Sequence, residues 1–499
     1  MSGSDMRPRA ARKRRHAKTG LPERPPGEPA EEPPGTAQGA IGRWRALAVL
    51  CFVDFMLVID ETVVNVAMPS MRDGLGLSLS SLAWVADGYW LLYGGFLLLG
   101  GRAGDLLGRR RLFLAGLTLF TVASLINGLA PNGTVLILFR AVQGLGAAFT
   151  APTSLALIQI LFPESGERTR ALGIWGGISG MGGAAGLLLG GALTDLLSWR
   201  WIFFINVPIG IAVLLVLPRM IRADPPERSG RFDLPGALTI TGGLTALVYA
   251  ALQAGHNGWG SARTVSMLVA AAVLVAAFVL IERRAENPLI PAAFLRVRTT
   301  AVANALALVV PSAFAGTFFI LTIYLQTAGG YSALRTGFAY LTLVAGMLIA
   351  IPLATQTLVP KLGPRWVLAM GLLIMAAGSL TFVRLPEHAS YLSDIVPGLA
   401  LIGFGAGWTF IPVTIAAVDR AKPEFSGLAA GVFNAALQIG GALALALYVA
   451  VAAAWTRHLP GQDALSAQLG GYHAAFLVGA GLSVAAAVGA AVGLRGLRK

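Results

Sequence analysis

Acidic side chains stand where a charge is expensive. The stretch "IDETVVNVAMP", residues 59–69, carries Asp60 and Glu61 inside a long apolar run, and Asp87 lies in the next apolar run. A charge at the centre of a bilayer costs about 2.5–3.5 kcal/mol even on a lenient insertion scale. Removal from water also favours the protonated form of a carboxyl group. These acids are therefore predicted to load and release a proton, which coupling to a proton gradient requires.

The acids of the first apolar run point in different directions if that run is a helix. Asp54, Glu61 and Asn65 recur at helical spacing and share one side. Asp60 is turned from Glu61 by about 100°, given 3.6 residues per turn. Asp60 and Glu61 are therefore not expected to face the same cavity. The alternative role for Asp60 is a neutral acid that hydrogen-bonds a neighbouring helix.

Arg140 is the one base that falls deep within an apolar run. It can snorkel to the membrane surface. It can also be a buried counter-charge that favours the ionised form of a nearby acid. Gln143, one helical turn later, can hydrogen-bond in the same region. We therefore include Arg140 with Asp60, Glu61 and Asp87 in the predicted proton-coupling set.

The elements that position these residues must be membrane helices. Hydrophobic residues make up 56 % of the 499-residue chain and charged residues only 12 %. A helix needs about 20 mostly apolar residues to cross a bilayer. Reading apolar runs between breaks predicts fourteen spans, at 44–69, 81–101, 112–130, 134–161, 171–193, 201–218, 234–253, 264–281, 301–326, 336–356, 366–383, 395–417, 426–455 and 473–494.

The distribution of positive charge predicts the orientation of these spans. Most of the 38 Lys and Arg residues fall in the N-terminal tail, in alternate loops and at the C-terminus. Positive residues gather on the cytoplasmic side of membrane proteins. Both termini are therefore expected in the cytoplasm. Residues 1–43 are rich in Arg, Pro, Glu and Gly and are predicted to be a disordered cytoplasmic tail.

Several classes of protein are excluded by what the sequence lacks. Cys51 is the single cysteine, so no intramolecular disulfide forms, and the five histidines have no metal-ligand spacing. The sequence contains no nucleotide-binding loop, no HExxH motif and no nucleophile set. A membrane-embedded enzyme and an ATP-driven pump are therefore disfavoured. We expect no enzyme activity, no metal site, no cofactor and no nucleic-acid partner.

An internal repeat links the two ends of the chain. "LGRRRLFLAGL" at 107–117 matches "LGPRWVLAMGL" at 362–372, and "GLGAAFT" at 144–150 matches "GFGAGWT" at 403–409. Parallel repeats in a protein with many spans are typical of transporters whose substrate site lies between the halves. We predict an N-terminal six-helix bundle at 44–218, a linker with two extra helices at 219–300 and a C-terminal six-helix bundle at 301–499.

The chain resembles the fourteen-span drug:proton antiporters of the major facilitator superfamily over about residues 44–495. The resemblance rests on the combination of "IDETVVNVAMP", "GRAGDLLGRRR" at 101–111, "RAVQGLG" at 140–146 and "SWRWIFFINVPIG" at 198–210. It implies the major facilitator fold, favours Asp60 as the proton carrier and implies a part in proton transfer for Arg140. It also implies export rather than import.

The resemblance implies further roles. Asp105 and Arg109, with Gly101 and Gly108, correspond to a gating loop; the simpler alternative is positive charge that only sets topology. Glycines implied to allow close helix packing are Gly144, Gly146, Gly182, Gly186, Gly190 and Gly191. Leu187 replaces the proline of the family's fifth-span motif, so the bend which that proline makes is not expected here.

The substrate cavity is predicted from polar and aromatic residues in apolar runs. Aromatic walls with a few polar groups suit lipophilic compounds. The candidates are Asn65, Gln143, Tyr324, Gln326 and Gln438. Because the last six spans have no interior acid, neutral or singly charged substrates are expected in preference to divalent cations.

The sequence thus predicts a proton-coupled efflux antiporter for lipophilic drugs or antibiotics, working as a monomer in a bacterial cell membrane. Its partners would be the substrate, protons and membrane lipids. A transporter of the same fold for a native metabolite is the alternative. Raised tolerance to unrelated compounds on overexpression would favour the first.

Overall fold

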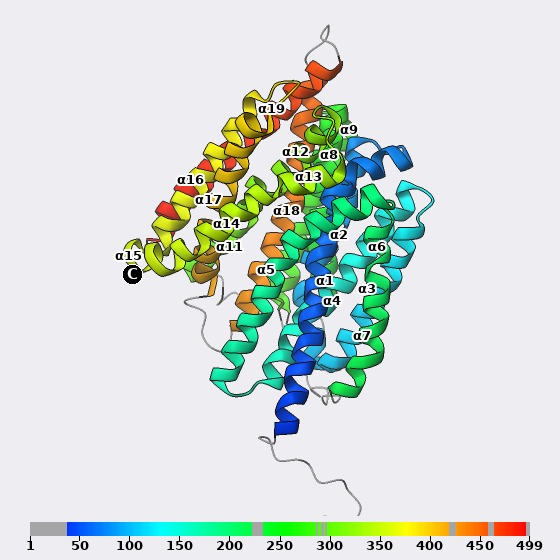
Figure 1. Ribbon diagram of the computed structural model, residues 1–499, viewed down its shortest axis with the longest axis vertical. Coiled ribbons are helices and arrows are strands. Elements are labelled where there is room, and N and C mark those ends of the chain that lie inside the picture. Colours follow the sequence, from blue (N-terminus) through cyan, green and yellow to red (C-terminus); the bar gives the residue numbers. More distant parts are fainter. Residues whose placement is uncertain are drawn as a thin grey trace, which may run out of the picture. The chain divides into compact units, whose positions relative to one another are not determined.

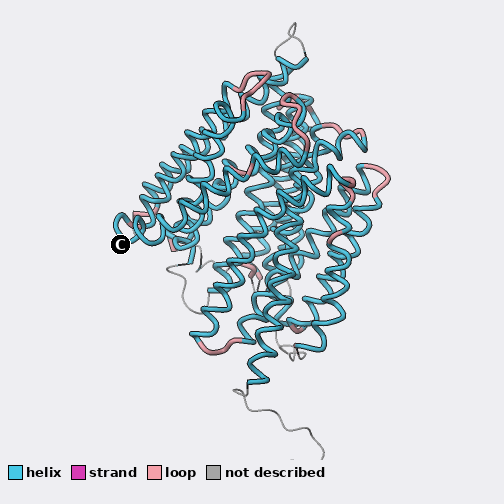
Figure 2. Tube along the Cα trace, in the orientation of Figure 1, coloured by secondary structure: helices cyan, strands magenta, loops and turns pink. Residues whose placement is uncertain are grey.

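The computed structural model describes residues 37–221, 233–285, 288–290, 294, 297–418, 426–457 and 464–495. The chain separates into a unit Met1–Gly42 and a unit Arg43–Lys499. All the described secondary structure is helical, as predicted (Figure 2). Most of the predicted tail, residues 1–36, lies outside the described residues.

The helices follow the order of the predicted spans (Figure 1). Those before the linker are α1 (Ala37–Leu75), α2 (Leu79–Leu107), α3 (Arg109–Leu129), α4 (Gly133–Leu161), α5 (Ser165–Leu196), α6 (Trp201–Phe204) and α7 (Asn206–Met220). The linker helices are α8 (Leu234–Asn257) and α9 (Ala262–Arg284). Those after it are α11 (Arg298–Val309), α12 (Ala315–Thr327), α13 (Ala333–Ala339), α14 (Leu341–Leu353), α15 (Val359–Leu362), α16 (Pro364–Thr381), α17 (Val396–Val418), α18 (Ser426–Arg457) and α19 (Ala464–Gly493).

Twelve helices among the described residues are long and apolar enough to cross a membrane, against the fourteen spans predicted. The two remaining predicted spans are 44–69, which lies in α1, and 301–326, which lies in α11 and α12. Helix α1 is 39 residues long but carries three acids in its apolar run. The predicted span 301–326 is interrupted between α11 and α12 by a 3-10 turn, Val310–Ala313, which begins next to Pro311.

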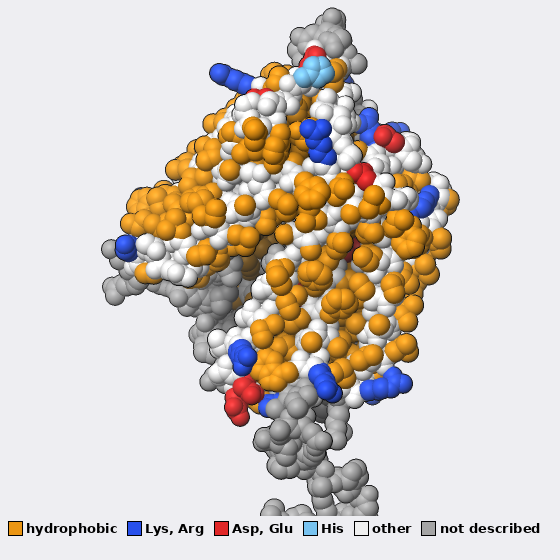
Figure 3. Space-filling view, viewed as in Figure 1, with side chains coloured by type: hydrophobic (Ala, Val, Ile, Leu, Met, Phe, Trp, Pro, Cys, Tyr) orange, Lys and Arg blue, Asp and Glu red, His pale blue; other side chains and the backbone are white. Residues whose placement is uncertain are grey.

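The surface of the helical unit fits an apolar surrounding. Large hydrophobic side chains are exposed on many helices, for example Leu138, Leu215, Leu348 and Val488. Figure 3 shows hydrophobic side chains covering the flanks of the molecule in this view, while Lys, Arg, Asp and Glu gather toward its two ends. An exposed apolar flank between charged ends is what a membrane-spanning bundle presents to lipid.

The internal repeat is present in the backbone. Gly108 precedes α3 with φ +95°, and Gly363 precedes α16 with φ +81°. Only glycine adopts such angles without strain. Both glycines end one helix and start the next, so the matched sequences "LGRRR" and "LGPRW" make the same break.

The repeat extends to the packing of the next helix. In the first half, a Cβ on Gly116 of α3 would lie 2.9 Å from the Gly146 carbonyl oxygen of α4. In the second half, a Cβ on Gly371 of α16 would lie 2.8 Å from the Gly405 carbonyl oxygen of α17. Thr150 in the first half and Thr409 in the second also lie against these glycines. Each threonine hydroxyl donates a hydrogen bond to the carbonyl oxygen of the facing glycine, Gly146 or Gly405. Helices α3–α4 and α16–α17 are therefore equivalent pairs.

The predicted packing glycines all sit at close helix contacts. Gly144 packs against the Tyr89 backbone of α2, and Gly146 packs against the Phe120 backbone of α3. On α5, Gly182, Gly186 and Gly190 face Val58, Thr62 and Val63 of α1. The glycines of α5 thus allow close packing against α1, the helix that carries Asp54, Asp60 and Glu61. Figure 1 shows α5 and α1 side by side. With Leu187 at the proline position, α5 runs unbroken.

The two halves meet through α5 and α13. A Cβ on Gly191 of α5 would lie 2.6 Å from the Cα atom of Leu334 on α13, so the backbones touch. The Asp195 carboxylate accepts hydrogen bonds from the backbone N–H groups of Ala333, at 3.1 Å, and Leu334, at 2.8 Å. A carboxylate at a helix N-terminus is stabilised by the unpaired N–H groups and the helix dipole.

The halves also meet along α2 and α18. A Cβ on Gly94 of α2 would lie 3.1 Å from the carbonyl oxygen of Ala435 on α18. Further along, a Cβ on Gly441 would lie 3.5 Å from the Trp90 ring. The linker helix α8 also packs against α2 here, because a Cβ on Gly95 of α2 would overlap the Thr241 side chain of α8.

We predict that Gly144→Ala destabilises the fold. The added Cβ would overlap the Tyr89 carbonyl of α2, and overpacking costs about 1–3 kcal/mol. The matched control is Gly183→Ala on α5, where a Cβ meets nothing within 4 Å. That control should hold or raise stability, because Ala is the better helix former. Thermal unfolding of the purified variants in detergent measures both, and equal midpoints would contradict the close contact.

Candidate functional site

Asp60 is at the centre of a buried polar network. Its Oδ2 accepts a hydrogen bond from Arg140 Nη1 of α4 at 2.6 Å. Its Oδ1 accepts from Gln143 Nε2 at 2.8 Å and from Asn206 Nδ2 of α7 at 2.7 Å. Asp60 is 0 % exposed and Arg140 is 1 % exposed. Three donors and one positive charge therefore surround a carboxylate that has no contact with solvent in this conformation.

Arg140 is held from several sides. Its Nε donates to the Val85 carbonyl of α2 at 3.1 Å, and its Nη1 also donates to Gln143 Oε1 at 2.9 Å. Its guanidinium carbon lies 4.4 Å from the centroid of the Tyr89 ring and 5.7 Å from that of Phe203. Arginine over an aromatic face is further stabilised by the ring quadrupole. Arg140 is thus a buried counter-charge, not a residue that snorkels to the surface.

Helix α3 completes the network. The Ser124 hydroxyl donates to the Phe203 carbonyl at 2.9 Å and lies 3.0 Å from Asn206 Nδ2. Asn127 Nδ2 donates to Gln143 Oε1 at 2.9 Å. Buried networks of hydrogen bonds favour one arrangement of the helices that they join. The Asp60 network therefore ties α1 to α2, α3, α4, α6 and α7.

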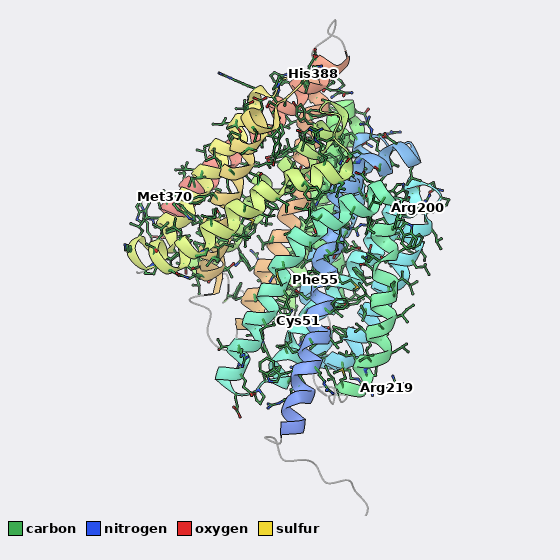
Figure 4. The ribbon with its side chains drawn as sticks, viewed as in Figure 1. Cys51, Phe55, Arg200, Arg219, Met370 and His388 are labelled. Carbon is green, nitrogen blue, oxygen red and sulfur yellow. The ribbon has the colours of Figure 1, made fainter. Side chains whose placement is uncertain are left out.

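The segment α6–α7 brings the last donor into place. Figure 4 labels Arg200 and Arg219, which mark its two ends. Arg200 donates to the Gly128 and Ala130 carbonyl oxygens at the end of α3, at 3.0 and 2.8 Å. The short helix α6 ends at Phe204, and α7 begins at Asn206. This break turns the Asn206 side chain inward to Asp60.

Glu61 faces a different set of neighbours. Its Oε1 accepts a hydrogen bond from Trp90 Nε1 of α2 at 2.8 Å. Gln438 of α18, from the second half, lies near the Glu61 carboxylate and packs against Gly94 of α2. Glu61 is partly exposed, as is Asn65 one turn later. Among the described residues, no Lys, Arg or His forms an ion pair with Glu61.

The three acids in the apolar run of α1 therefore have different neighbours. Asp54 accepts a hydrogen bond from Ser179 of α5. Asp60 contacts α4 and α7, and Glu61 contacts α2 and α18. The prediction that Asp60 and Glu61 face different ways is confirmed. Asp54 and Glu61 share a side of α1 but not a neighbour. Figure 4 labels Cys51 and Phe55, which mark the part of α1 that carries Asp54.

Asp87 is the acid without a partner. It is 0 % exposed, and neither carboxylate oxygen has a hydrogen-bond donor among the described residues. An ionised carboxyl left unpaired in a dry interior is very costly. This conformation therefore suits a neutral Asp87 and an ionised Asp60. The structure does not bring Asp87 into the Asp60 network.

The predicted gating pair lies at the turn between α2 and α3. Arg109 Nη2 contacts Asp105 Oδ1 at 2.8 Å, and both side chains are about one-third exposed. The two residues are not on one continuous helix, because Gly108 ends α2 and starts α3. Gly101 is partly exposed, and its Cβ position is 3.9 Å from Pro152 of α4.

The predicted substrate residues are scattered. Gln143 is 0 % exposed and belongs to the Asp60 network. Tyr324 is 1 % exposed, and its hydroxyl donates to the Pro386 carbonyl, so it packs against the loop after α16. Gln326 Nε2 donates to the Val66 carbonyl of α1 at 2.9 Å, across the two halves. Of the five candidates, Asn65 and Gln438 lie beside Glu61.

Sequence reasoning missed residues that the structure places in the network. Asn206 lies within the quoted "SWRWIFFINVPIG", and Ser124 and Asn127 are polar residues inside the third apolar run. Their signal was a hydrogen-bonding side chain in hydrocarbon. Trp90 carried no such signal, because tryptophan is common in membrane helices. Only the helix arrangement shows that its indole N–H reaches Glu61.

Several bacterial resistance and export proteins are similar to this chain over most of its length. It is 42 % identical over 407 residues to the puromycin resistance protein pur8 of Streptomyces alboniger, covering 81 % of each chain. It is 37 % identical to the cephamycin export protein CmcT of Amycolatopsis lactamdurans, over 84 % of this chain and 86 % of that one. It is 34 % identical to the lincomycin resistance protein of Streptomyces lincolnensis, with the same coverage.

Solved structures share the fold. The crystal structure of the POT family transporter PepTSo matches with a TM-score of 0.67 at 17 % identity, over 90 % of this chain and 98 % of that one. A bacterial homologue of the lysosomal transporter Spinster, in an inward-facing and occupied conformation, matches with a TM-score of 0.61 at 16 % identity, over 91 % and 97 % of the two chains. At these identities the likeness concerns the fold alone.

The helical architecture and these relatives together establish a multi-pass protein of the bacterial cell membrane. A family model described as Major Facilitator Superfamily matches residues 50–445. The chain belongs to the Major Facilitator Superfamily.

Proposed function

We propose that the protein is a proton-coupled efflux antiporter that exports lipophilic drugs or antibiotics by alternating access. The relatives at 34–42 % identity are named for resistance to, or export of, puromycin, cephamycin and lincomycin. The observation that carries the coupling is the sealed Asp60–Arg140 pair. The transporter works as a monomer, uses no bound cofactor and has no enzyme activity.

Protonation of Asp60 would have a large effect on the structure, because it would neutralise the partner of Arg140. Three donors are arranged around an anionic Asp60. A protonated Asp60 would leave Arg140 buried without a counter-charge, and removing one partner of a buried pair is strongly destabilising. Helix α1 must then move relative to α4 and α7. A ligand shifts a conformational equilibrium when it binds one state better, and here the ligand is the proton.

Access to Asp60 requires the second conformation. Because Asp60 is 0 % exposed here, the proton reaches it only when α1 has moved away from α4. Binding and release of the proton are therefore tied to the movement itself. Glu61 and Asp87 are further acids of the coupling set, and Glu61 is the one that is partly exposed in this conformation.

We propose fourteen spans with both termini cytoplasmic. Helix α1 and the interrupted pair α11–α12 add two spans to the twelve helices of suitable length. A charged residue inside a span is tolerated where it faces protein, as Asp60 does. The halves are 44–218 and 301–499, and the linker at 219–300 carries α8 and α9.

Single-cysteine labelling tests the orientation. In a Cys51→Ala background, Asp73→Cys at the exposed end of α1 should react with an impermeant maleimide on intact cells. Glu164→Cys at the exposed start of α5 should react only in everted vesicles. The spans α2, α3 and α4 separate the two positions, and α4 contains no break between its ends. In the proposed topology the two positions therefore lie on opposite sides of the membrane. Labelling of both from the same side would contradict that topology.

A double-mutant cycle tests the buried pair. Asp60→Asn and Arg140→Gln should each lower the unfolding free energy of the purified protein by about 3–5 kcal/mol, because each leaves a partner uncompensated. The double variant should lose less than the sum of the two. The control cycle uses Asp105→Asn and Arg109→Gln, a partly exposed pair whose coupling should be about 1 kcal/mol or less. Additive losses at Asp60 and Arg140 would contradict a direct interaction.

Transport in everted vesicles tests the function. With an imposed proton gradient, the wild-type protein should accumulate two unrelated lipophilic antibiotics, and each should release protons on addition to the purified protein. Asp60→Asn should abolish both responses, whereas Glu387→Gln, at an exposed acid, should retain them. Unchanged proton release in Asp60→Asn would assign the proton to Glu61 or Asp87. Transport of a single metabolite and no antibiotic would favour the alternative substrate class.

A further inference from the structure

We propose that Glu282, at the end of α9, is a positioning residue for the transport cycle. Its carboxylate fixes Leu289 and Ile290 of the linker against both halves of the protein. Glu282, Leu289 and Ile290 together are the linker clamp. This inference rests on the proposed alternating-access function and assigns a part in it to the linker. The clamp shares no residue with the Asp60 network.

The Glu282 carboxylate holds the linker by its main chain. Its Oε1 accepts a hydrogen bond from the backbone N–H of Leu289 at 2.9 Å, and its Oε2 accepts one from the backbone N–H of Ile290 at 3.2 Å. Hydrogen bonds to an ionised carboxylate are stronger than those between neutral groups. Because both oxygens are used, one side chain fixes two consecutive peptide groups, and with them the directions of the Leu289 and Ile290 side chains.

The two clamped residues pack into different hydrophobic clusters. Leu289 packs against a cluster from α2, α4 and α8, which comprises Phe96, Leu99, Ala148 and Ala237. Ile290 packs against a cluster that comprises Phe294 of the linker, Ala429 and Val432 of α18 and the partly buried Leu98 of α2. Consecutive residues of the linker therefore contact the first half and the seam between α2 and α18, where the first half meets the second.

The linker helices lie across the same seam. Helix α8 contacts the first half where a Cβ on Gly95 of α2 would overlap the Thr241 side chain. It contacts the second half where a Cβ on Gly255 would lie 2.8 Å from the Ala450 Cα atom of α18. Helix α9 packs against α8 and is largely exposed. Glu282 therefore gives this exposed helix a connection to both halves.

Asp233 places the start of α8 close to the clamp. Its Oδ1 accepts a hydrogen bond from the Gly236 N–H at 2.8 Å, which caps α8. Such a cap satisfies one of the N–H groups that the first turn of a helix leaves unpaired. Asp233 is buried and lies near Glu282. The start of α8 and the end of α9 thus lie together beside the clamped residues.

The clamp opposes separation of α2 from α18 at this end. Here the two helices are in contact, because a Cβ on Gly431 of α18 would lie 2.9 Å from Leu98 of α2. Alternating access requires the halves to rock against each other. Since Glu282 fixes the Ile290 backbone, the Ile290 side chain cannot stay with both helices as they part, and exposing its apolar surface is unfavourable. The clamp therefore favours the conformation described here.

Distances between spin labels on the full-length protein in nanodiscs test the clamp. The labels are attached at Glu164→Cys, at the exposed start of α5, and at Lys361→Cys, on the exposed surface of α15, in a Cys51→Ala background. The proposed topology places both positions on the cytoplasmic side, one in each half. Glu282→Ala should raise the ratio of long to short distances about tenfold, as expected for lost hydrogen bonds to a charged group.

Three further variants separate the clamp from a general loss of structure. Ile290→Ala keeps the carboxylate but removes the packing, and it should shift the ratio in the same direction. Glu282→Gln keeps one acceptor and should give an intermediate ratio. Arg283→Gln changes an exposed residue next to Glu282, so it is the matched control and should keep the wild-type ratio.

The outcomes are distinguishable. A ratio within twofold of the wild-type ratio in either Glu282→Ala or Ile290→Ala overturns the proposal, as does an equal shift in Arg283→Gln. If Glu282→Ala does not fold, Glu282→Gln replaces it, with an expected shift of about threefold. The measurement needs neither a substrate nor a proton gradient. Failure of proton-driven export in vesicles would therefore refute the proposed function without deciding the role of the clamp.

Discussion

The Asp60–Arg140 ion pair is the interaction on which the rest of the first half depends. Two opposite charges at 2.6 Å in a dry interior are stable only when the remaining donors and acceptors are satisfied. That requirement explains Gln143 on α4, Asn206 on α7 and Ser124 on α3. The network in turn needs close helices, and the glycines of α4 allow them: Gly144 against α2 and Gly146 against α3.

The same pair separates the surroundings of two acids that are adjacent in the chain. Because Asp60 is turned toward α4 and α7, its charge is compensated within the first half. Glu61, about 100° around the helix, accepts a hydrogen bond from Trp90 of α2 and lies near Gln438 of α18 in the second half. A single helix thereby presents one acid to the bundle interior and another to the interface between the halves.

Much of this could be predicted from the sequence, because the strongest signals were local. Apolar run length located the helices, and the positions of Asp60 and Glu61 on a helix gave their divergence. The matched stretches located the repeated α3–α4 and α16–α17 pairs. Long-range partners could not be predicted: nothing in the sequence places Trp90 beside Glu61, or Tyr324 against the Pro386 loop. Helix breaks at Pro311 and between Phe204 and Asn206 were also missed, because hydropathy does not register them.

The joint between α5 and α13 has a consequence for how the halves separate. Gly191 meets the Leu334 backbone directly, and Asp195 contacts main-chain N–H groups, not side chains. Because these contacts are made to main-chain atoms, parting the helices at this point breaks the two hydrogen bonds of Asp195. Water can then take the place of each lost N–H partner at the exposed carboxylate. The joint thus combines a close backbone approach with hydrogen bonds that water can replace, which suits a surface that parts and rejoins in each proposed transport cycle.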